Sequence, residues 1–417
     1  MSGKSSKFPD AGDETRISVF GATGSIGCST LDVVRHLSAQ RRFRVVALTG
    51  NRNVALLADQ ALEFRPQVAV IADASGLAVL RERLAGTGIE AAAGEDALLD
   101  AASRPTEWTM AGIVGIAGLR PTLAAARTGA TIALANKECL VCAGELFLAE
   151  CRKSGATVLP VDSEHNAIFQ VWETRNAAAV ERIVLTASGG PFRDWPVERM
   201  AGVSPDDAMR HPNWSMGQRI SIDSASLFNK ALEMIEARHL FGLPPERIEV
   251  VIHPQSVIHS MVGYSDGSIL AQLGSPDMRT AIGYALSWPD RSHMPVERLD
   301  FAKLARLDFS APDPVRFPAL QLAREAMAAG GLAGAVLNGA KEAALNAFLA
   351  GQCGFLDIAA AVEHAMTVCV PSAADDLEAV YDTDRAARRA ATEFLARKRN
   401  GRLRRPHEPA RTGSTDR

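Results

Sequence analysis

The chain has 417 residues, of which 47% are hydrophobic, so it is long enough for more than one hydrophobic core, and we expect two or three domains. Its formal net charge is -3, with charges of both signs interleaved, which excludes the large basic field of a nucleic-acid binder. The first fourteen residues are polar and acidic, and no run of about 18 apolar residues is free of charge, so we expect a cytoplasmic protein with no membrane partner.

A parallel α/β domain is predicted for residues 16–160, after a disordered tail at 1–15. Arg16–Phe20 has the composition of a buried strand, a glycine-rich turn follows, and apolar periodicity predicts a helix over Ile26–Leu37. Strand-like and helical stretches then alternate, which is typical of a doubly wound sheet. The further strands are expected at 44–48, 68–71, 112–114 and 131–135, and the further helices at 54–63 and 119–128.

The remainder of the chain divides into a central and a C-terminal part. Residues 161–297 carry polar, histidine-rich and glycine-rich loops between strands expected at 182–186, 249–252 and 268–272, so we predict a catalytic α/β domain there. The proline-punctuated stretch 298–318 reads as a linker. Residues 319–397 are alanine-rich with helical periodicity, which predicts a helical bundle. The basic end, 398–417, is predicted to be disordered, with contacts to phosphate-rich partners as the alternative.

The glycine-rich turn reads GATGSIG, in which Gly21, Gly24 and Gly27 are spaced as in a dinucleotide-binding fingerprint. Such glycines permit a tight turn, close approach of the backbone to a pyrophosphate, and close packing of helix on strand. The position after a strand and before a helix supplies the context that this motif requires. We predict nucleotide binding here, with a merely structural turn as the alternative.

The end of the second predicted strand favours NADPH over NADH. An NAD enzyme usually places an acidic residue there for the ribose 2′-hydroxyl, whereas this chain has Gly50, Asn51, Arg52 and Asn53. A guanidinium and two amides suit a 2′-phosphate instead. The alternative is that Arg52 is a solvated loop residue.

Asp162 and Glu164 follow an apolar stretch, and in an extended chain positions two apart point the same way, so we expect their carboxylates to converge. Paired carboxylates repel unless a cation or a shared proton is present, and oxygen ligands favour Mg²⁺ or Mn²⁺ over zinc. A surface acidic pair is the alternative. Cys139 and Cys142 form a C-x-x-C pair without partners at zinc-site spacing, so we predict small buried side chains there rather than redox or metal chemistry.

The segment Ile220–Glu236 reads as a strand entering a helix whose start carries Ser224 and Ser226, hydroxyls that favour an anion. Asn229, Lys230 and Glu233 are spaced to share one helix face, with Lys230 suited to a phosphate and Glu233 to a third metal-ligand position. A solvated charged face is the alternative. Upstream, 211–217 (HPNWSMG) is predicted to be a lid whose Trp214 excludes water from a ligand.

These motifs, together with NKE at 136–138, DSEHNAIFQ at 162–170, SGGPF at 188–192 and HPQSVIHSMV at 253–262, recur in this order in one family. From about Arg16 to Arg397 the chain resembles the 1-deoxy-D-xylulose 5-phosphate reductoisomerases. The resemblance implies an NADPH domain, a catalytic domain and a helical domain in a homodimer. It also implies that the chain rearranges and reduces 1-deoxy-D-xylulose 5-phosphate to 2-C-methyl-D-erythritol 4-phosphate, in non-mevalonate isoprenoid precursor biosynthesis, with NADPH and Mg²⁺ or Mn²⁺.

By motif position the resemblance implies roles for particular residues. The metal ligands would be Asp162, Glu164 and Glu233, and the catalytic residues Lys137, Glu164 and His211. The substrate would contact Lys137, Ser163, Glu164, Ser188, His211, Trp214, Ser224, Asn229, Lys230 and Glu233. The cofactor would contact Thr23, Gly24, Ser25, Ile26, Gly50, Asn51, Arg52, Asn53, Asn136, Glu138 and Gly217. The departures from the usual pattern are Cys139, Arg219, Ala231, Ala281 and Lys341, none of them a proposed ligand.

Two other functions share part of this pattern. A metal-dependent aldolase or isomerase without redox chemistry would use the carboxylates but leave the glycine-rich turn and Arg52 unexplained. A non-catalytic NADPH-binding regulator would explain the turn but not the acidic residues.

Overall fold

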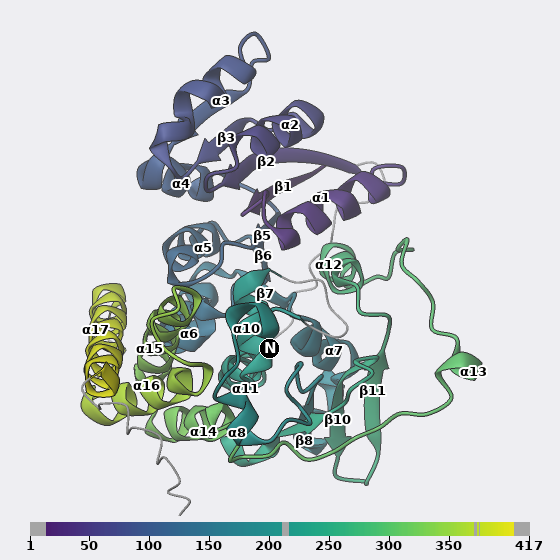
Figure 1. The fold of residues 1–417 in the computed structure, drawn as a ribbon. Helices are drawn as coiled ribbons and strands as arrows, with labels where there is room; N and C mark the ends of the chain where they lie inside the picture. The colour runs from purple at the N-terminus through teal and green to yellow at the C-terminus, as the bar shows by residue number, and fades with distance from the viewer. Residues whose placement is uncertain (1–13, 211–216, 371–372, 375, 404–417) are drawn as a thin grey trace, which may run out of the picture.

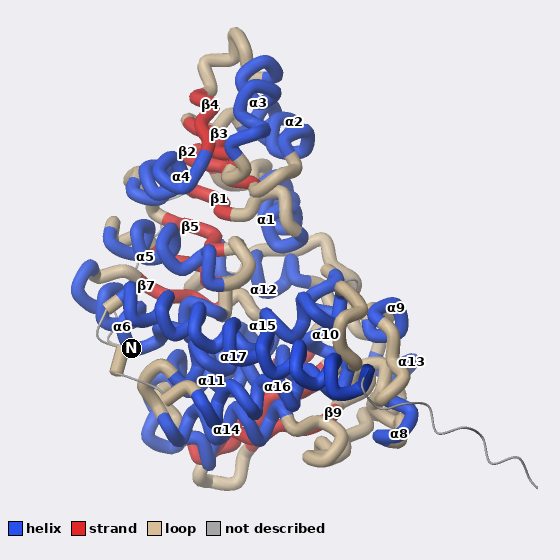
Figure 2. The backbone as a smooth tube through the Cα atoms, turned by 60° about the vertical axis from the view of Figure 1, so that its left-hand side comes forward, coloured by secondary structure: helices blue, strands red, loops and turns tan. Residues whose placement is uncertain are grey.

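The computed structural model describes residues 14–210, 217–370, 373–374 and 376–403. Figure 1 shows the N-terminal sheet with its helices at the top, and a second sheet and a helical bundle below it. The same stacking is visible after rotation in Figure 2. No helix in these described ranges is long and apolar enough to cross a membrane.

The N-terminal sheet has seven parallel strands in the order β4-β3-β2-β1-β5-β6-β7, which confirms the predicted doubly wound α/β fold. Its central strands are buried over most of their length, where their composition is apolar. The strands are β1 (Glu14–Phe20), β2 (Arg42–Gly50), β3 (Val68–Ile71), β4 (Glu90–Ala93), β5 (Trp108–Ala111), β6 (Thr131–Leu134) and β7 (Thr157–Pro160).

Several details of this part differ from the prediction, and one of them is that strand β7 was not predicted. The strand expected at 112–114 is wrong, because β5 lies just before it, where Thr109 interrupts the apolar run yet is buried. Strand β4 was not predicted, because three of its four residues are alanines, which favour strands weakly. The tail predicted over 1–15 is wrong at its end, since β1 begins at Glu14.

Helices cover both faces of the sheet, and alternate side chains of β1 show the two cores. Ile17 and Val19 belong to the core under α1, α2 and α3, whereas Phe20 belongs to the core under α4, α5 and α6. The helices are α1 (Ser25–Leu37), α2 (Val54–Phe64), α3 (Leu77–Arg83), α4 (Gly94–Ser103), α5 (Leu119–Arg127) and α6 (Glu138–Ser154).

A helix from much later in the chain completes the first of these cores. Ile282 and Leu286 of α12 (Met278–Ser287) are buried among the residues of α1 and β1. The indole nitrogen of Trp108 donates a hydrogen bond to the carbonyl of Ala285 at 3.1 Å. The sheet ends at Pro160, where a domain boundary is predicted, but its hydrophobic core takes in this later segment.

The second sheet has four strands in the order β11-β10-β8-β9, with β8 and β9 parallel and β10 antiparallel to both β8 and β11. Strand β10 was not predicted, because its sequence is interrupted by His259 and Ser260. The elements of this part are α7 (Ser163–Val171), β8 (Val180–Ala187), α8 (Val197–Met200), α9 (Pro205–Ala208), α10 (Gln218–Ala225), α11 (Phe228–Phe241), β9 (Ile248–Ile252), β10 (Ile258–Tyr264) and β11 (Ile269–Leu273).

The strand expected to begin at Ile220 is wrong. Residues 218–225 form helix α10, and Leu227, with φ 59°, separates it from α11. The alternation of Ile220, Ser221, Ile222 and Asp223 resembles a strand locally, but Ser221, Ile222 and Asp223 are all buried by surrounding elements, so tertiary packing decides the conformation.

The C-terminal part is a helical bundle, as predicted. A short helix, α13 (Phe301–Leu304), lies in the stretch predicted to be a linker. The last helix continues to Leu403, so the prediction that order ends at residue 397 is wrong by one to two turns. The bundle helices are α14 (Ala319–Ala329), α15 (Ala333–Leu349), α16 (Phe355–Val368) and α17 (Leu377–Leu403), and the short 3-10 helices of the chain are η1 (Ala74–Gly76), η2 (Ile116–Gly118), η3 (Thr174–Ala179) and η4 (Pro245–Arg247).

The glycine-rich turn makes the fold sensitive to single methyl groups. Gly21 has φ +79°, and a Cβ added at Gly27 would lie 2.2 Å from the carbonyl oxygen of Gly21 and 2.4 Å from the Cα of Ala22. We expect Gly27→Ala to lower the free energy of unfolding by about 2–3 kcal/mol, because rigid backbone would have to move. The urea unfolding midpoint measures this loss.

Gly202→Ala is the matched control. The nearest atom to an added Cβ there is 3.9 Å away, so its effect is expected to stay within about 0.5 kcal/mol. Equal midpoints for the two variants would show that helix α1 does not pack tightly against the turn.

Candidate active site

A cavity of about 330 Å³ opens where β6, β7 and β8 end and α1, α10, α11 and α12 approach one another. The carboxyl ends of strands in an α/β sheet are the usual position of a ligand site. The lining comes from segments far apart in the sequence, so only the folded chain assembles it. The lining residues are Ser25, Ile26, Ser29, Ala135, Lys137, Asp162, Ser163, Glu164, Thr186, Ala187, Ser188, Gly217, Ile220, Ser224, Leu227, Asn229, Lys230, Ser256, Ile258, His259, Pro276, Asp277 and Met278.

Two carboxylates of the lining, those of Asp162 and Glu164, converge with a third, that of Glu233, which does not itself line the cavity. Single oxygen atoms of Asp162, Glu164 and Glu233 all lie within 4.8 Å of one another. The expected extended geometry of Asp162 and Glu164 is wrong: Asp162 caps the N-terminus of α7 and accepts a hydrogen bond from the backbone N–H of Glu164 at 3.3 Å. The cap brings the two carboxylates together, and α11 adds Glu233, which is completely buried.

Two ammonium groups and one amide lie among these carboxylates. The Nζ of Lys137 donates to Asp162 Oδ2 at 2.7 Å and to Asn229 Oδ1 at 2.8 Å, and it lies 3.4 Å from Glu233 Oε1. The Nζ of Lys230 is 2.9 Å from Glu164 Oε1 and also contacts Glu233. Asn229 and Lys230 both contact Glu233, so the three side chains lie on one face of α11, as their spacing predicts.

The surroundings separate the proton affinities of the acids. Burial, together with Asp162 and Glu164, raises the pKa of Glu233 to about 7. Burial would also raise the pKa of Asp162, but Lys137 and His165 outweigh it and hold that pKa well below its usual range. These carboxylates are buried and repel one another, and a divalent cation bound among them would offset that repulsion.

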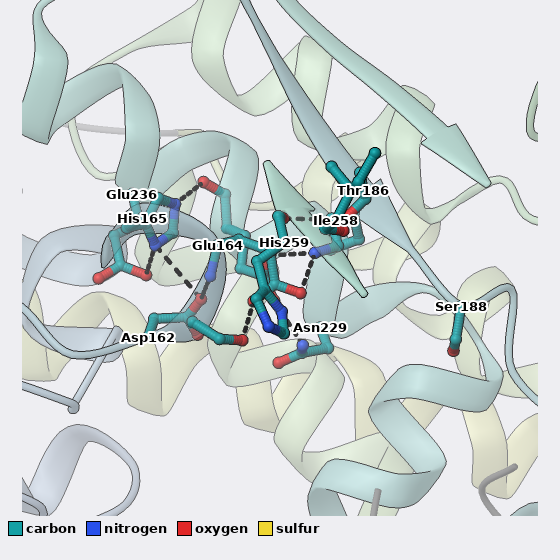
Figure 3. Close-up of polar contacts among 12 residues, drawn as sticks. Asp162, Glu164, His165, Thr186, Ser188, Asn229, Glu236, Ile258 and His259 are labelled. Carbon is teal, nitrogen blue, oxygen red and sulfur yellow. Dashed lines mark hydrogen bonds and ion pairs between the residues drawn. The ribbon is translucent and has the colours of Figure 1, made fainter. Parts of the chain in front are cut away.

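A second group of possible metal ligands shares Asp162 and adds His165 and Glu236. The Nδ1 of His165 lies 3.1 Å from Glu236 Oε2 and 3.6 Å from Asp162 Oδ1, and Figure 3 shows the ring between the two acids. Its Nε2 contacts the backbone carbonyl of Glu233 at 2.9 Å. Burial opposes charge on this ring, but Glu236 and Asp162 raise the pKa of His165 to about 9. A protonated ring cannot ligate a metal. His165 and Glu236 are therefore placed outside the ligand set, where they contact Asp162 and the backbone of Glu233.

Neutral hydrogen-bonding groups also line the cavity. Ser188 and Ser224 are among them, and Figure 3 shows Ser188 apart from the acidic residues. Asn229 and Lys230, which also line the cavity, lie beside the carboxylates. The expectation that Ser224 and Ser226 begin a helix is wrong, because they lie at the end of α10. The hydroxyl of Ser226 donates back to the carbonyl of Ile222 at 2.9 Å, whereas Ser224 faces the cavity.

The residues predicted to contact a cofactor fall into three groups. Ser25, Ile26 and Gly217 line the cavity, and Thr23 and Gly24 belong to the same turn as the first two. The loop 50–53 lies outside the cavity lining, at the carboxyl end of β2, where Arg52 is 83% exposed and 3.4 Å from Asp73. Asn136 and Glu138 are buried, and the side chain of Asn136 bonds to the backbone of Gly115 and Cys139.

Several lining residues were not predicted. His259, whose pKa burial lowers, comes from β10, and Ser256 from the loop before it; both lie within the motif HPQSVIHSMV, which was the available signal. Met278 and Asp277 come from the start of α12 and had no signal of their own. The predicted residues His211 and Trp214 lie outside the described residues.

The cysteine pair has no part in the site. Cys139 and Cys142 are buried, as predicted. Burial raises the pKa of both thiols well above the usual range, so neither forms a reactive thiolate at neutral pH.

Known proteins share both the sequence and this architecture. Family models match as follows: 1-deoxy-D-xylulose 5-phosphate reductoisomerase over residues 17–144, its C-terminal domain over 158–241, and the DXP reductoisomerase C-terminal domain over 273–390. The chain is 62% identical over 381 residues to the 1-deoxy-D-xylulose 5-phosphate reductoisomerase of Rhizobium meliloti (strain 1021), which covers 91% of this chain and 97% of the relative.

Two solved structures superpose on it with a TM-score of 0.87. One is the Zymomonas mobilis 1-deoxy-D-xylulose 5-phosphate reductoisomerase in complex with NADPH, 54% identical, covering 92% of this chain and 99% of that one. The other is a DOX-P reductoisomerase in complex with NADPH, fosmidomycin and magnesium, 42% identical, covering 92% and 98%. Since these matches run from the glycine-rich turn into the C-terminal bundle, the chain belongs to the 1-deoxy-D-xylulose 5-phosphate reductoisomerase family.

Proposed function

We propose that the cavity is where this chain carries out the reaction of its family, with the three carboxylates holding a divalent metal and the neighbouring serine, asparagine and lysine side chains holding the substrate phosphate. The chain is an NADPH- and metal-dependent enzyme that converts 1-deoxy-D-xylulose 5-phosphate to 2-C-methyl-D-erythritol 4-phosphate. The observation that carries the assignment of the site is the convergence of three carboxylates within 4.8 Å of one another. Two of them, Asp162 and Glu164, line a cavity that also reaches Ser25 and Ile26 of the glycine-rich turn, and the third, Glu233, is buried behind them.

The donor set fits Mg²⁺ or Mn²⁺. All three proposed ligands, Asp162, Glu164 and Glu233, offer carboxylate oxygen, which hard divalent cations prefer. The ammonium groups of Lys137 and Lys230 already lie against these carboxylates, which shows that the site stabilises positive charge. A bound divalent cation would polarise the carbonyl and hydroxyl oxygens of the substrate and stabilise negative charge that develops there.

The side chains around the metal site have distinct roles in this proposal. Lys137 lies where it can donate a hydrogen bond to a substrate oxygen and assist proton movement. Ser163 donates to Glu164 at 2.6 Å and orients that carboxylate. Ser188, Ser224, Asn229 and Lys230 bind the phosphate, so binding energy far from the reacting carbons holds the fragments together during the rearrangement.

One assay tests the proposal against its alternatives. NADPH oxidation is followed with 1-deoxy-D-xylulose 5-phosphate, with and without Mg²⁺. Oxidation only with both substrate and metal supports the proposal. A metal-dependent change of the sugar phosphate without NADPH oxidation would indicate an aldolase or isomerase, and NADPH binding without any conversion would indicate a regulator.

We also propose that Arg52 binds the 2′-phosphate of NADPH. Its guanidinium is exposed at the carboxyl end of β2, beside the loop that begins α2. Arg52→Ala is therefore expected to weaken NADPH binding by about 1–2 kcal/mol, roughly tenfold, and NADH binding hardly at all, because only NADPH carries the charge that the guanidinium would pair with. Fluorescence titration with both cofactors measures this.

Arg65→Ala serves as the control, because Arg65 follows α2 at its other end. Equal losses of NADPH and NADH affinity in the Arg52 variant would place this side chain away from the 2′-phosphate.

The homodimer implied by the resemblance also belongs to the proposal. Strand β11 is at the edge of the second sheet, and Ile269 and Leu270 on it are 51% and 39% exposed. Phe301 and Phe309, from the segment that follows α12, are exposed as well. An unpaired strand edge with apolar side chains can be covered by a second copy of the chain. The mass in solution from light scattering tests this, and a monomer at micromolar concentration would contradict it.

A further inference from the structure

A buried lysine links the C-terminal bundle to the catalytic part of the chain. Lys341 of α15 is 1% exposed, and its Nζ donates to Asp223 Oδ2 of α10 at 2.9 Å and to Glu342 Oε1 at 2.6 Å. Arg219 of α10 donates to Glu342 Oε2 at 2.8 Å and also bonds to the side chain of Asn346. These residues (Arg219, Asp223, Lys341 and Glu342) form what we call the α10–α15 charge cluster.

The cluster constrains geometry strongly because most of it is out of water. Burial alone would lower the pKa of Lys341, but Asp223 and Glu342 outweigh it and raise that pKa above its usual range, so the ammonium stays charged. Two buried ions tolerate little separation, because each would then lose its compensating charge in a medium that solvates it poorly. The charged side chains therefore tie α10 to α15.

Helix α10 presents a different face to the cavity. Gly217, Ile220 and Ser224 line the cavity, at spacings that follow one side of a helix. Arg219 and Asp223, four residues apart, lie on the side that contacts α15. Any shift of the cluster side therefore moves Ser224, since both sides belong to the same two-turn helix.

Helix α15 is a firm base for this contact. Its middle is buried, with Val336, Leu337, Ala340 and Ala344 in the same core as α6 and α17. In Figure 1, α15 lies between α17 and α10. The start of α6 also contributes, because Glu138 interacts electrostatically with Lys341. The C-terminal bundle is thus one of the parts that fix the position of α10, beside α11 and α9, on which α10 also packs.

We propose that Lys341 and Asp223 are positioning residues: the α10–α15 charge cluster holds α10 so that Ser224 faces the substrate phosphate, and it thereby sets the affinity for the sugar phosphate without touching it. The inference rests on the phosphate role proposed above for Ser224. No cluster residue lines the cavity, so the cluster does not touch the substrate and is proposed to act through the placement of α10.

The test compares kinetic constants and stability in matched variants. Lys341→Met keeps the length of the side chain and removes its charge. We expect the KM for 1-deoxy-D-xylulose 5-phosphate to rise about tenfold, the equivalent of about 1.4 kcal/mol, with kcat changed less than about threefold and NADPH affinity unchanged. The double variant Asp223→Asn with Lys341→Met removes both charges, so no buried ion is left alone. It is expected to recover stability relative to the single variant but to keep the raised KM.

Lys398→Met is the control for a general loss of stability. Lys398 pairs with Asp357 at 2.7 Å within the bundle, away from α10, so this variant is expected to lower the urea midpoint and leave the KM unchanged. A wild-type KM in both Lys341 variants, with a lowered midpoint, would make the cluster merely structural and overturn the inference.

Ser224→Ala distinguishes failure of the inference from failure of the phosphate assignment. If Ser224→Ala raises the KM and the Lys341 variants do not, positioning by the cluster is wrong and the phosphate assignment stands. If Ser224→Ala leaves the KM unchanged, the phosphate role of Ser224 is wrong, and the inference falls with it.

Discussion

Chelation of divalent metal is expected to lower turnover at least about 10³-fold while NADPH affinity changes less than about twofold. The loss follows because several kcal/mol of stabilisation of developing negative charge are withdrawn. NADPH affinity survives because the proposed ligands, Asp162, Glu164 and Glu233, lie beyond the glycine-rich turn, on α7 and α11 and at the cap of α7. Steady-state NADPH oxidation and fluorescence titration, both in chelator, measure the two effects. Restoration by excess Mg²⁺ is the control, and full activity in chelator would contradict the metal assignment.

The same site predicts how metal affinity depends on pH. With its pKa at about 7, Glu233 carries a proton below that pH, and a proton and a metal compete for the carboxylate. Apparent Mg²⁺ affinity is therefore expected to fall as the pH is lowered from 8 to 6, by up to about tenfold per pH unit below 7, and to level off above it. Calorimetric titration at several pH values would show this. An affinity independent of pH would place Glu233 outside the ligand set.

Lys137→Met is expected to lower kcat by about 10²–10³-fold, the range typical of losing one hydrogen-bond donor to negative charge that develops in the reaction. Burial alone would lower the pKa of Lys137, but Asp162 and Glu233 outweigh it and raise that pKa well above its usual range. The ammonium is therefore charged at every pH at which the enzyme is tested, and methionine replaces it with a neutral chain of similar length. Steady-state kinetics at saturating Mg²⁺ give the change in kcat.

Lys153→Met is the matched control for that variant. Lys153 is exposed in the last turn of α6, the helix that begins directly after Lys137, so the same substitution there is expected to leave kcat unchanged. A near-normal kcat for Lys137→Met with a raised KM would mean that Lys137 only binds the substrate.

The parts of the site that the sequence could predict are those whose chemistry is local. The glycine-rich turn, the pair Asp162 and Glu164, and the face of α11 each lie within a few residues, so spacing alone indicated that they act together. Even there the conformation was partly wrong, because an N-cap and an extended strand can both bring positions two apart to one side. The residues that act together could thus be predicted even where the backbone conformation could not.

The remaining parts depend on contacts between distant segments. Nothing near His165 in the sequence indicates that Glu236 pairs with it, since helix α11 and helix α7 meet only in the folded chain. His259 reaches the cavity because β10 pairs with β8, a pairing that the polar residues of β10 hid. The sequence around Lys341 is an alanine-rich helix and does not indicate that its side chain pairs with Asp223 of α10. Such contacts are set by tertiary packing, which local periodicity does not report.

The return of α12 to the N-terminal sheet bears on how the chain is made. The core under α1 is incomplete until Ile282, Ala285 and Leu286 have been synthesised. The indole of Trp108 likewise has no hydrogen bond to the carbonyl of Ala285 before then. When the ribosome has synthesised β7, all seven strands of the sheet exist but the hydrophobic core of the domain is incomplete. Apolar surface on α1 therefore remains exposed to solvent while more than a hundred further residues are synthesised. At about 5–20 residues per second this interval lasts on the order of ten seconds, long enough for a chaperone to bind the nascent chain.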